Sequence, residues 1–341
     1  MARAQLDIAY EHIISLENLL EAWREFAKGK RERKDVQQFE LRLMSNVLSL
    51  HNDLSARTYA HSPYEAFNIS DPKPRNIHKA RVRDRLLHHA LYRQLYPFFD
   101  KTFIAGSYSC RKGKGSHKAI GHFQSAAYQV SLNHTRTVWV LKCDIRKFFA
   151  SIDQAVLMDI LLSRIPDKDI LWLIRRVVES FQSTAPGKGL PLGNLTSQLF
   201  VNIYMNEFDQ FAKHQLKARR YIRYADDFVF LSADKKQLET VLPHVRQFLR
   251  NELRLSLHPD KVSISTVASG VDFLGWVHFP NHRVLRATTK RRMFRTIEQR
   301  AGKEETVQSY LGLLSHGNTR KLQQEVMALR EVYSTGNAPE R

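Results

Sequence analysis

Two adjacent acids, Asp226 and Asp227, lie in a short turn between two strand-like runs, and this pattern constrains the fold more than any other in the chain. The run before them covers 221–223, and the apolar run Phe228–Leu231 follows them directly. The pattern predicts a tight β-hairpin over 219–232 that lifts both carboxylates out of a sheet. The alternative is a surface turn without chemistry, because paired Asp residues in turns are often only solvated turn formers.

A third acid, Asp144, ends another strand-like stretch, for which we predict a strand over 137–144. One carboxylate from a strand end and two from a neighbouring hairpin can hold two Mg²⁺ ions about 3.5–4 Å apart, the arrangement of two-metal phosphoryl transfer. Mn²⁺ can take the place of Mg²⁺ at such oxygen ligands. The three carboxylates therefore predict polymerase-type nucleotidyl transfer.

The composition favours a nucleic-acid partner. Lys and Arg number 53 against 34 Asp and Glu, which gives a formal net charge of +19. Such a surplus is the electrostatic footprint of a nucleic-acid-binding protein, although solubility alone is an alternative explanation. No apolar run approaches the ~18 residues of a membrane span, so we expect no membrane partner and a cytoplasmic location. The two cysteines, Cys110 and Cys143, are expected to be free thiols in a reducing compartment.

Seven blocks in order along the chain resemble the motifs of reverse transcriptases. They are Arg75–Arg85 and Ser107–His117 for the fingers, Asp144–Asp153 for the first catalytic block, then Gly189–Gln198, Tyr224–Asp227, Leu255–Lys261 and Phe273–Trp276. The resemblance implies an α+β right-hand polymerase with fingers, palm and thumb, an antiparallel palm sheet, and a helical N-terminal extension and thumb. The expected divisions are an extension at 1–60, fingers at 61–136, a palm at 137–280 with a fingers insertion at about 154–188, and a thumb at 281–341.

Hydrophobic periodicity predicts the helices. We expect two helices within 1–56, joined by the charged stretch Lys28–Lys34, and further helices at 82–96, 153–164, 167–182, 195–216 and 235–251. Short strands are expected near 262–266 and 271–279. A last helix should begin near Thr289 and turn Met293, Phe294, Ile297 and Ala301 inward.

The resemblance also implies roles at the catalytic centre. Asp144 and Asp226 would hold both metal ions, with Asp227 in support and the carbonyl of Ile145 as a further ligand. Lys261 would protonate the departing pyrophosphate, unless it is only a solvated lysine.

Other residues would contact the incoming nucleotide. Lys73 and Arg75 fall where the fingers contact the triphosphate, and Arg81, Arg83 and Arg85 offer further cations. Phe149 matches the ring that excludes a 2′-OH, with a core aromatic as the alternative. Leu192 and Gly193 complete the nucleotide-binding set.

A third group would hold the template and primer. Its members are Arg111, Lys112, Lys114, Gln198, Tyr224, Gly275, Trp276, Lys290, Arg291 and Arg295. The last three belong to the stretch 283–303, which contains eight basic residues and a single acid, Glu298. A solvated basic face is the alternative explanation there.

The block Leu192–Gln198 departs from the common Gln-Gly-x-x-x-Ser-Pro pattern, because Leu replaces Gln and Gln replaces Pro. In this respect the chain is similar to the reverse transcriptases of diversity-generating retroelements, which are bacterial or phage-encoded. Those enzymes copy a template-repeat RNA into cDNA with errors at template adenines. The residues after the palm are expected to be too few for an intron-type maturase domain plus a zinc-binding endonuclease.

The resemblance implies an RNA template, a DNA or RNA primer, dNTPs and a small basic accessory protein as partners. One alternative is a retron-type or phage-defence enzyme that copies a dedicated noncoding RNA. Another is a maturase-like RNA-binding factor whose polymerase site is vestigial. Intact Asp144, Asp226, Asp227 and Lys261 argue against the latter.

Overall fold

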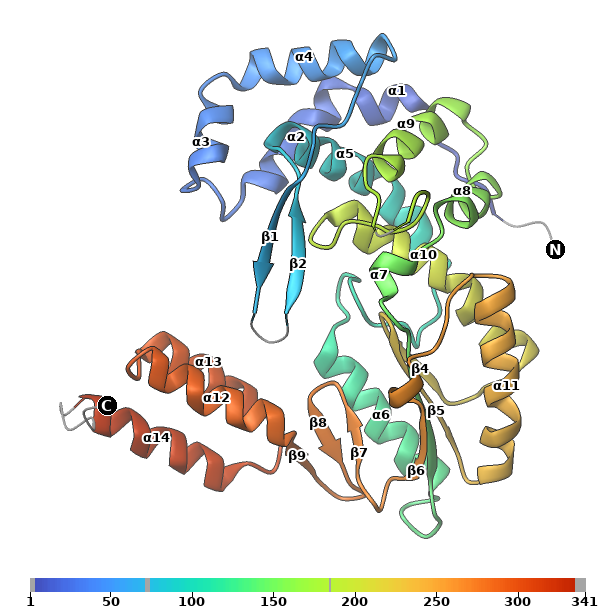
Figure 1. The fold of residues 1–341 in the computed structure, drawn as a ribbon, viewed down its shortest axis with the longest axis vertical. Coiled ribbons are helices and arrows are strands. Elements are labelled where there is room, and N and C mark those ends of the chain that lie inside the picture. Colours follow the sequence, from blue (N-terminus) through green and yellow to red (C-terminus); the bar gives the residue numbers. More distant parts are fainter. Residues whose placement is uncertain (1–3, 71–73, 184, 335–341) are drawn as a thin grey trace. The chain divides into compact units, whose positions relative to one another are not determined.

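The computed structural model describes residues 4–70, 74–183 and 185–334. The chain forms two compact units, each assembled from three stretches of sequence. The first comprises Met1–Gly115, Cys143–Phe228 and Val241–Val262, and the second comprises Ser116–Lys142, Val229–Thr240 and Ser263–Arg341. Helices and antiparallel strands are mixed along the chain (Figure 1), which confirms the predicted α+β class. The assignment of fingers, palm and thumb, with its boundaries, stays a prediction.

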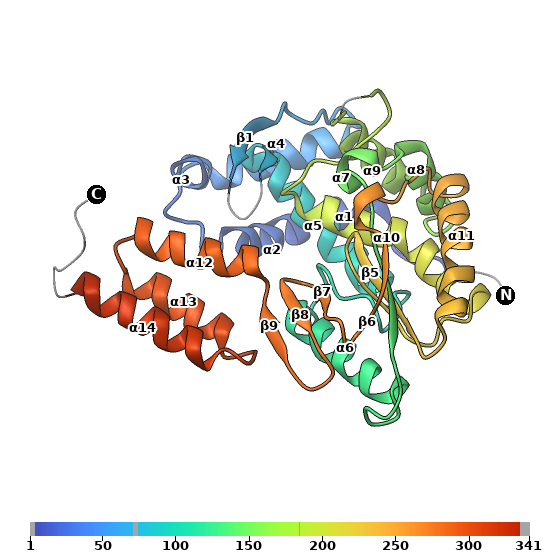
Figure 2. The same ribbon diagram turned by 60° about the horizontal axis from the view of Figure 1, so that its bottom comes forward.

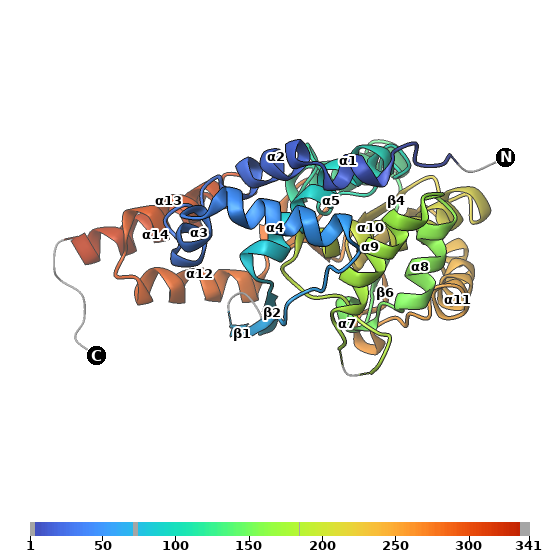
Figure 3. The same cartoon turned by 90° about the horizontal axis from the view of Figure 1, so that it is seen from above.

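The first unit begins with four helices packed beside a fifth (Figure 3). They are α1 (Tyr10–Ile14), α2 (Leu16–Ala27), α3 (Lys34–Glu40), α4 (Leu43–Ser55) and α5 (Val82–Asp100). The Ser15 side chain caps α2 by accepting from the Asn18 backbone N–H, and Trp23 of α2 stacks on Phe39 of α3 at 5.1 Å. Two helices were expected before residue 56, but the chain breaks each one, at Ser15 and at 41–42.

A hairpin that the sequence did not predict lies between α4 and α5. Strands β1 (Glu65–Ile69) and β2 (Arg75–Lys79) pair antiparallel, with Ile69 opposite Arg75. Neither strand buries a clean alternating face, so the period-2 signal is missing from the sequence. Lys73 lies outside the described residues.

The middle of the first unit is helical, as predicted. Its elements are α7 (Phe148–Ser151), α8 (Gln154–Leu162), α9 (Lys168–Glu179), α10 (Leu195–Gln210) and a π-helical turn η1 (Phe211–Gln215). Asp153 and Asp167 cap α8 and α9 by accepting from backbone N–H groups of the first turns. These caps explain why both helices begin where the sequence indicates.

A four-stranded sheet of order β4-β5-β3-β6 carries the acidic residues. Its strands are β3 (Trp139–Asp144), β4 (Tyr221–Tyr224), β5 (Asp227–Ser232) and β6 (Ser263–Thr266). The predicted hairpin is confirmed, with Ala225 and Asp226 as its two-residue turn. The predicted helix α11 (Lys235–Asn251) follows the hairpin.

The segment Gly106–Tyr108 runs along the outer side of β4. Arg223 donates its N–H to the carbonyl of Gly106 at 2.9 Å, and Tyr108 donates to the carbonyl of Arg223 at 3.0 Å. A Cβ at Gly106 would lie only 2.6 Å from the carbonyl oxygen of Tyr221. Glycine therefore permits the close approach of the two backbones.

The second unit combines α6 (Ser116–Val130) with a three-stranded sheet and three C-terminal helices (Figure 2). The strands are β7 (Val271–Phe273), β8 (Trp276–His278) and β9 (Arg283–Leu285); the helices are α12 (Ala287–Gln299), α13 (Glu304–Leu314) and α14 (Arg320–Ser334). The expected stretch 271–279 is a hairpin, turned at Leu274 and Gly275, which both have positive φ. Helix α6 and strand β9 were not predicted.

The core of the second unit gathers Trp276, Met293, Ile297 and residues of α13 and α14. Met293 and Ile297 are buried as expected, and Phe294 packs partly buried against them. Ala301 does not point inward, because α12 ends at Gln299 and leaves Ala301 exposed with a φ of 45°. No helix among the described residues has both the length and the apolarity needed to cross a bilayer.

Candidate active site

The turn of the β4–β5 hairpin lies beside the end of β3. The backbone N–H of Ile145 donates to the carbonyl of Asp226 at 3.2 Å, which joins the two segments directly after Asp144. Ala225 reaches this geometry with a left-handed φ of 56°, a conformation that is unfavourable for a residue with a Cβ. The structure thus brings Asp144 and Asp226 together, as the sequence predicted.

The environment of Asp226 disfavours its ionised form. Burial raises the pKa of the Asp226 carboxyl, and the negative charge of Asp144 raises it further, while Lys261 and Arg75 act in the opposite direction. Two nearby carboxylates raise each other's pKa unless a cation compensates them. The pair therefore forms a centre of negative potential.

One compensating cation is Lys261, whose Nζ lies 2.9 Å from Oδ1 of Asp144. The lysine ends a short 3-10 turn, η2 (Pro259–Lys261), and the N–H of His258 just before it donates to the carbonyl of Asp144 at 2.7 Å. This backbone bond keeps Lys261 beside the end of β3. The structure brings together the predicted catalytic lysine and the predicted carboxylate.

The ligand set fits a hard divalent cation. Carboxylate and backbone carbonyl oxygens are the donors that Mg²⁺ prefers. Burial and the neighbouring Asp144 both raise the pKa of Asp226, and a bound cation would favour its ionised form. Asp227, the first residue of β5, does not complete a triad: within 4–70, 74–183 and 185–334, no three His, Cys, Asp or Glu side chains are gathered around one point. Its supporting role stays a prediction.

A fully buried ion pair supports the turn of the β4–β5 hairpin. Arg223 contacts Asp209 through two parallel bonds, of 2.7 Å from Nε and 2.6 Å from Nη2, and both side chains are 0% exposed. The guanidinium also donates to Ser107 Oγ at 3.0 Å and to the carbonyl of Ala225 at 3.2 Å. Arg223 therefore holds the turn that presents Asp226.

Sequence reasoning missed this pair. Asp209 lies in a helix 14 residues before Arg223, and neither residue belongs to a pattern that links them. The only signal was an arginine at a strand position whose neighbours are apolar.

The predicted nucleotide-side residues lie on several elements of the first unit. Arg75 begins β2, is exposed, and its charge lowers the pKa of Asp226. Phe149 is half-buried in α7, with its ring 5.6 Å from Phe148 in a T-shaped contact. Leu192 is half-buried, and its carbonyl accepts from the N–H of His78 at 3.1 Å. Gly193 beside it is exposed.

Two of the further cations that were predicted near the triphosphate have other partners. Arg83 pairs with Asp53 of α4, and Arg85 pairs with Asp35 of α3. These ion pairs attach α5 to the N-terminal helices, which accounts for both arginines without a nucleotide.

Arg111 is placed differently from its predicted role in template binding. Its guanidinium bonds Asp100 at 2.7 Å and the carbonyls of Ile104 and Ser107 at 2.7 and 3.0 Å, and its side chain is 7% exposed. It fixes the loop 104–111 rather than offering free donors. Lys112 is exposed, and Lys114 donates to the carbonyl of Ala105 at 3.0 Å.

The other predicted template residues of the first unit are partly accessible. Tyr224 ends β4 and is half-buried, and burial raises the pKa of its hydroxyl. Gln198 lies in the first turn of α10 and is half-buried too. Contact of either residue with a strand stays a prediction.

In the second unit, the predicted primer and template residues differ in exposure. The indole of Trp276 is 2% exposed and packs in the core, so its side chain is not available to a primer. Gly275 lies in the turn beside it and is half-buried. Arg291 and Arg295 are exposed on α12, whereas Lys290 pairs with Glu325 at 3.3 Å.

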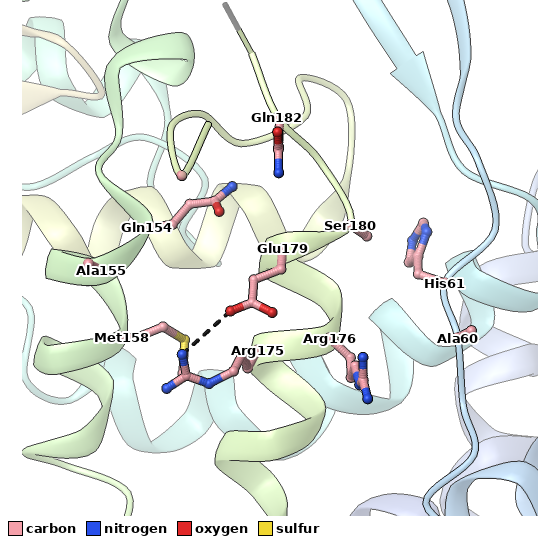
Figure 4. A pocket seen from close by; sticks show the side chains of 11 residues that line it. Ala60, His61, Gln154, Ala155, Met158, Arg175, Arg176, Glu179, Ser180 and Gln182 are labelled. Carbon is pink, nitrogen blue, oxygen red and sulfur yellow. Dashed lines mark hydrogen bonds and ion pairs between the residues drawn. The ribbon is translucent and has the colours of Figure 1, made fainter. Parts of the chain in front are cut away.

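A cavity of about 660 Å³ opens between α8, α9 and the segment around His61 (Figure 4). Arg175, Arg176 and Glu179 of α9 line it, and Arg175 pairs with Glu179 at 3.4 Å. None of the predicted site residues lines this cavity. The acidic centre is therefore a separate site.

Comparison with known proteins agrees with this chemistry. Residues 70–278 match the reverse transcriptase (RNA-dependent DNA polymerase) family. This match covers more than half of the chain and includes every acidic residue of the centre, and the chain therefore belongs to the reverse transcriptase family. It is an RNA-directed DNA polymerase by class, as predicted.

The relatives include bacterial and yeast proteins. The chain is 27% identical to protein YkfC of Escherichia coli over 291 residues, which are 74% of each protein. It is 21% identical to the group II intron-encoded protein LtrA of Lactococcus lactis, over 67% of this chain and 49% of that protein. It is 20% identical to a putative COX1/OXI3 intron 2 protein of Saccharomyces cerevisiae, over 68% and 34% respectively. The chain thus spans less than half of these two intron proteins.

Proposed function

We propose that this reverse transcriptase copies a template-repeat RNA into cDNA with elevated error at template adenines, as in diversity-generating retroelements. The observation that carries the proposal is the aliphatic Leu192 at the start of a block that ends in Gln198. A site that reads a partner through hydrogen bonds rejects a wrong partner strongly, whereas an aliphatic contact discriminates by only ~1–3 kcal/mol. Low discrimination beside the nucleotide is what error-prone copying needs.

The polymerising centre would use the residues described above. Asp144, Asp226 and the carbonyl of Ile145 would hold two Mg²⁺ ions, which when bound lower the pKa of the attacking 3′-OH and neutralise phosphate charge. Lys261 carries a proton at Nζ beside Asp144 and would deliver it to pyrophosphate. Arg75 would contact the triphosphate.

Phe149→Ala is expected to let the enzyme incorporate ribonucleotides, because the half-buried ring would no longer exclude a 2′-OH. The measurement is single-nucleotide extension with dNTP and rNTP on the same primer–template. Phe148→Leu is the matched control, since Phe148 is 4% exposed and belongs to the core. Unchanged dNTP preference in Phe149→Ala would make Phe149 a packing residue.

Leu192→Gln is expected to lower misincorporation opposite template adenine, because a polar side chain would restore hydrogen-bond discrimination. One defined RNA is copied by both proteins, and the cDNA is sequenced at every template base. Leu195→Gln is the control, because Leu195 is a half-buried residue of the same segment. Equal and low error at all four bases in the unmodified enzyme would contradict the retroelement class and leave the polymerase assignment intact.

The intron-encoded relatives favour a second candidate, an enzyme that copies a dedicated structured RNA with ordinary fidelity. A maturase-like RNA-binding factor without polymerase activity is a third candidate, which the intact Asp144, Asp226 and Lys261 argue against. Primer extension separates the factor from an enzyme, and the error profile separates the two enzymes. Sequencing the RNA that copurifies with the protein would identify the template, and the same preparation would reveal the small basic accessory protein that we expect.

A further inference from the structure

A stripe of polar side chains runs along the buried face of α10. Asn202, Asn206 and Asp209 are spaced three or four residues apart, so they lie on one side of the helix, and each is at most 4% exposed. Polar groups that are buried in this way normally have defined hydrogen-bond partners. Asp209 pairs with Arg223, and Asn202 is the member of the stripe whose partners belong to two different segments.

The first partner of Asn202 is the buried guanidinium. A guanidinium has five N–H donors in a fixed planar fork. Four of those of Arg223 bond Asp209, Ser107 and the carbonyl of Ala225. The remaining N–H of Nη1 donates to Oδ1 of Asn202 at 3.4 Å. Asn202 thus supplies the acceptor that completes the hydrogen bonding of this arginine.

The second partner of Asn202 is a backbone carbonyl. Its Nδ2 donates to the carbonyl of Ser109 at 2.8 Å. A carboxamide carries an acceptor and a donor on the two arms of one planar group, so the side chain can bond Arg223 and Ser109 at the same time. An aspartate at this position would lack the donor, and a leucine would lack both the donor and the acceptor.

Ser109 directly follows the segment Gly106–Tyr108 that lies beside β4. The backbone of this segment is paired with Arg223, and Asn202 holds the same segment from α10. Helix, segment and strand therefore enclose the guanidinium that bonds the carbonyl of Ala225, the residue before Asp226. A shift in any of the three would displace the Asp226 carboxylate, and displacements of ~1 Å in a reacting group are costly to catalysis.

We infer that Asn202 is a positioning residue of the polymerase reaction, which fixes the Asp226 carboxylate in the geometry that a divalent cation requires. It acts through Arg223 and Ser109, and not through contact with the strand or the nucleotide. Mg²⁺ demands near-ideal octahedral geometry, so its binding is sensitive to the place of each carboxylate. The inference rests on the proposed metal site at Asp144 and Asp226, and it is independent of which RNA is copied.

The test compares Asn202→Leu with the matched control Asn206→Leu. Asn206 lies one turn further along the same stripe, and its Oδ1 accepts from Gln210 Nε2 at 3.2 Å. Each substitution removes one buried amide from α10, so a general loss of packing affects both variants. Bound Mn²⁺ is measured by electron paramagnetic resonance in the complex with a dideoxy-terminated primer–template and dNTP, in which no turnover takes place. Single-turnover extension and urea denaturation are measured in parallel.

We expect Asn202→Leu to bind Mn²⁺ about tenfold more weakly than Asn206→Leu, because a hydrogen bond to a charged group contributes about that factor. Extension should slow by a similar factor and recover in part at high Mn²⁺ concentration. The same comparison is made with Asn202→Ala and Asn206→Ala, since alanine favours the helix and does not crowd the core. A variant that does not fold with leucine is then assessed with alanine.

Two outcomes would contradict the inference in different ways. Equal Mn²⁺ affinity in the Asn202 and Asn206 variants would overturn the role of Asn202 and leave the metal site intact. Asp226→Asn is the reference variant and should lose bound Mn²⁺. If it binds Mn²⁺ as the unmodified protein does, the proposed metal site is wrong, and the inference is overturned with it.

Discussion

Asp226→Asn and Asp144→Asn are each expected to abolish primer extension while leaving RNA affinity nearly unchanged. Each substitution preserves the shape of the side chain and removes a charge that would bind metal. Charge stabilisation by such a site is worth several kcal/mol in the transition state, so the rate should fall roughly a thousandfold or more. The measurement is single-turnover extension of a labelled primer across a range of Mg²⁺ concentrations, with RNA binding measured in parallel.

The control for this experiment is Asp260→Asn. Asp260 precedes Lys261, but its side chain is 86% exposed and does not contact the acidic centre. This variant should extend primers at nearly the normal rate. Near-normal turnover by Asp226→Asn or Asp144→Asn would exclude the two-metal assignment.

Arg223→Met is expected to lower the free energy of unfolding by about 3–5 kcal/mol, because it leaves the buried carboxylate of Asp209 without a compensating positive charge. The variant should also lose activity, since the guanidinium that holds the carbonyl of Ala225 is gone. Urea denaturation monitored by circular dichroism measures the stability change.

A second substitution tests whether the lost stability comes from the unpaired charge. Arg223→Met combined with Asp209→Leu should recover much of the stability, because removing both charges avoids an unpaired ion in the core. Arg219→Met, at an exposed position just before β4, is the matched control and should change stability little. Equal stability of Arg223→Met and the unmodified protein would show that the pair contributes nothing net.

The sequence predicted those elements whose signal is local. The hairpin around Asp226 and the helix over 235–251 were found because turn residues and periodicity mark them directly. The proximity of Asp144 and Asp226 was predicted from the strand-like runs that these residues end or join, whereas the place of Lys261 was predicted through resemblance to a family. The hairpin β1–β2 was missed, because its strands lack one clean buried face.

The sequence did not predict contacts between residues that are far apart along the chain. Arg111 looked like a free cation in a basic loop, and only the fold shows that Asp100 and nearby carbonyls engage it. Trp276 was expected to contact the template or primer, but its indole is buried in the hydrophobic core of the second unit. The sequence shows that a residue is basic, but which acid or carbonyl it contacts depends on the tertiary structure.

The segment Gly106–Tyr108 beside β4 has a consequence for the behaviour of the protein in solution. An outer strand with unpaired N–H and carbonyl groups is a template on which other chains can add, and such addition leads to aggregation. In β4, the backbone N–H and carbonyl of Arg223 are paired with the carbonyl of Gly106 and the N–H of Tyr108 of the same chain. These backbone groups of β4 are therefore not available to a strand of another chain, and the protection comes from the three-residue segment Gly106–Tyr108.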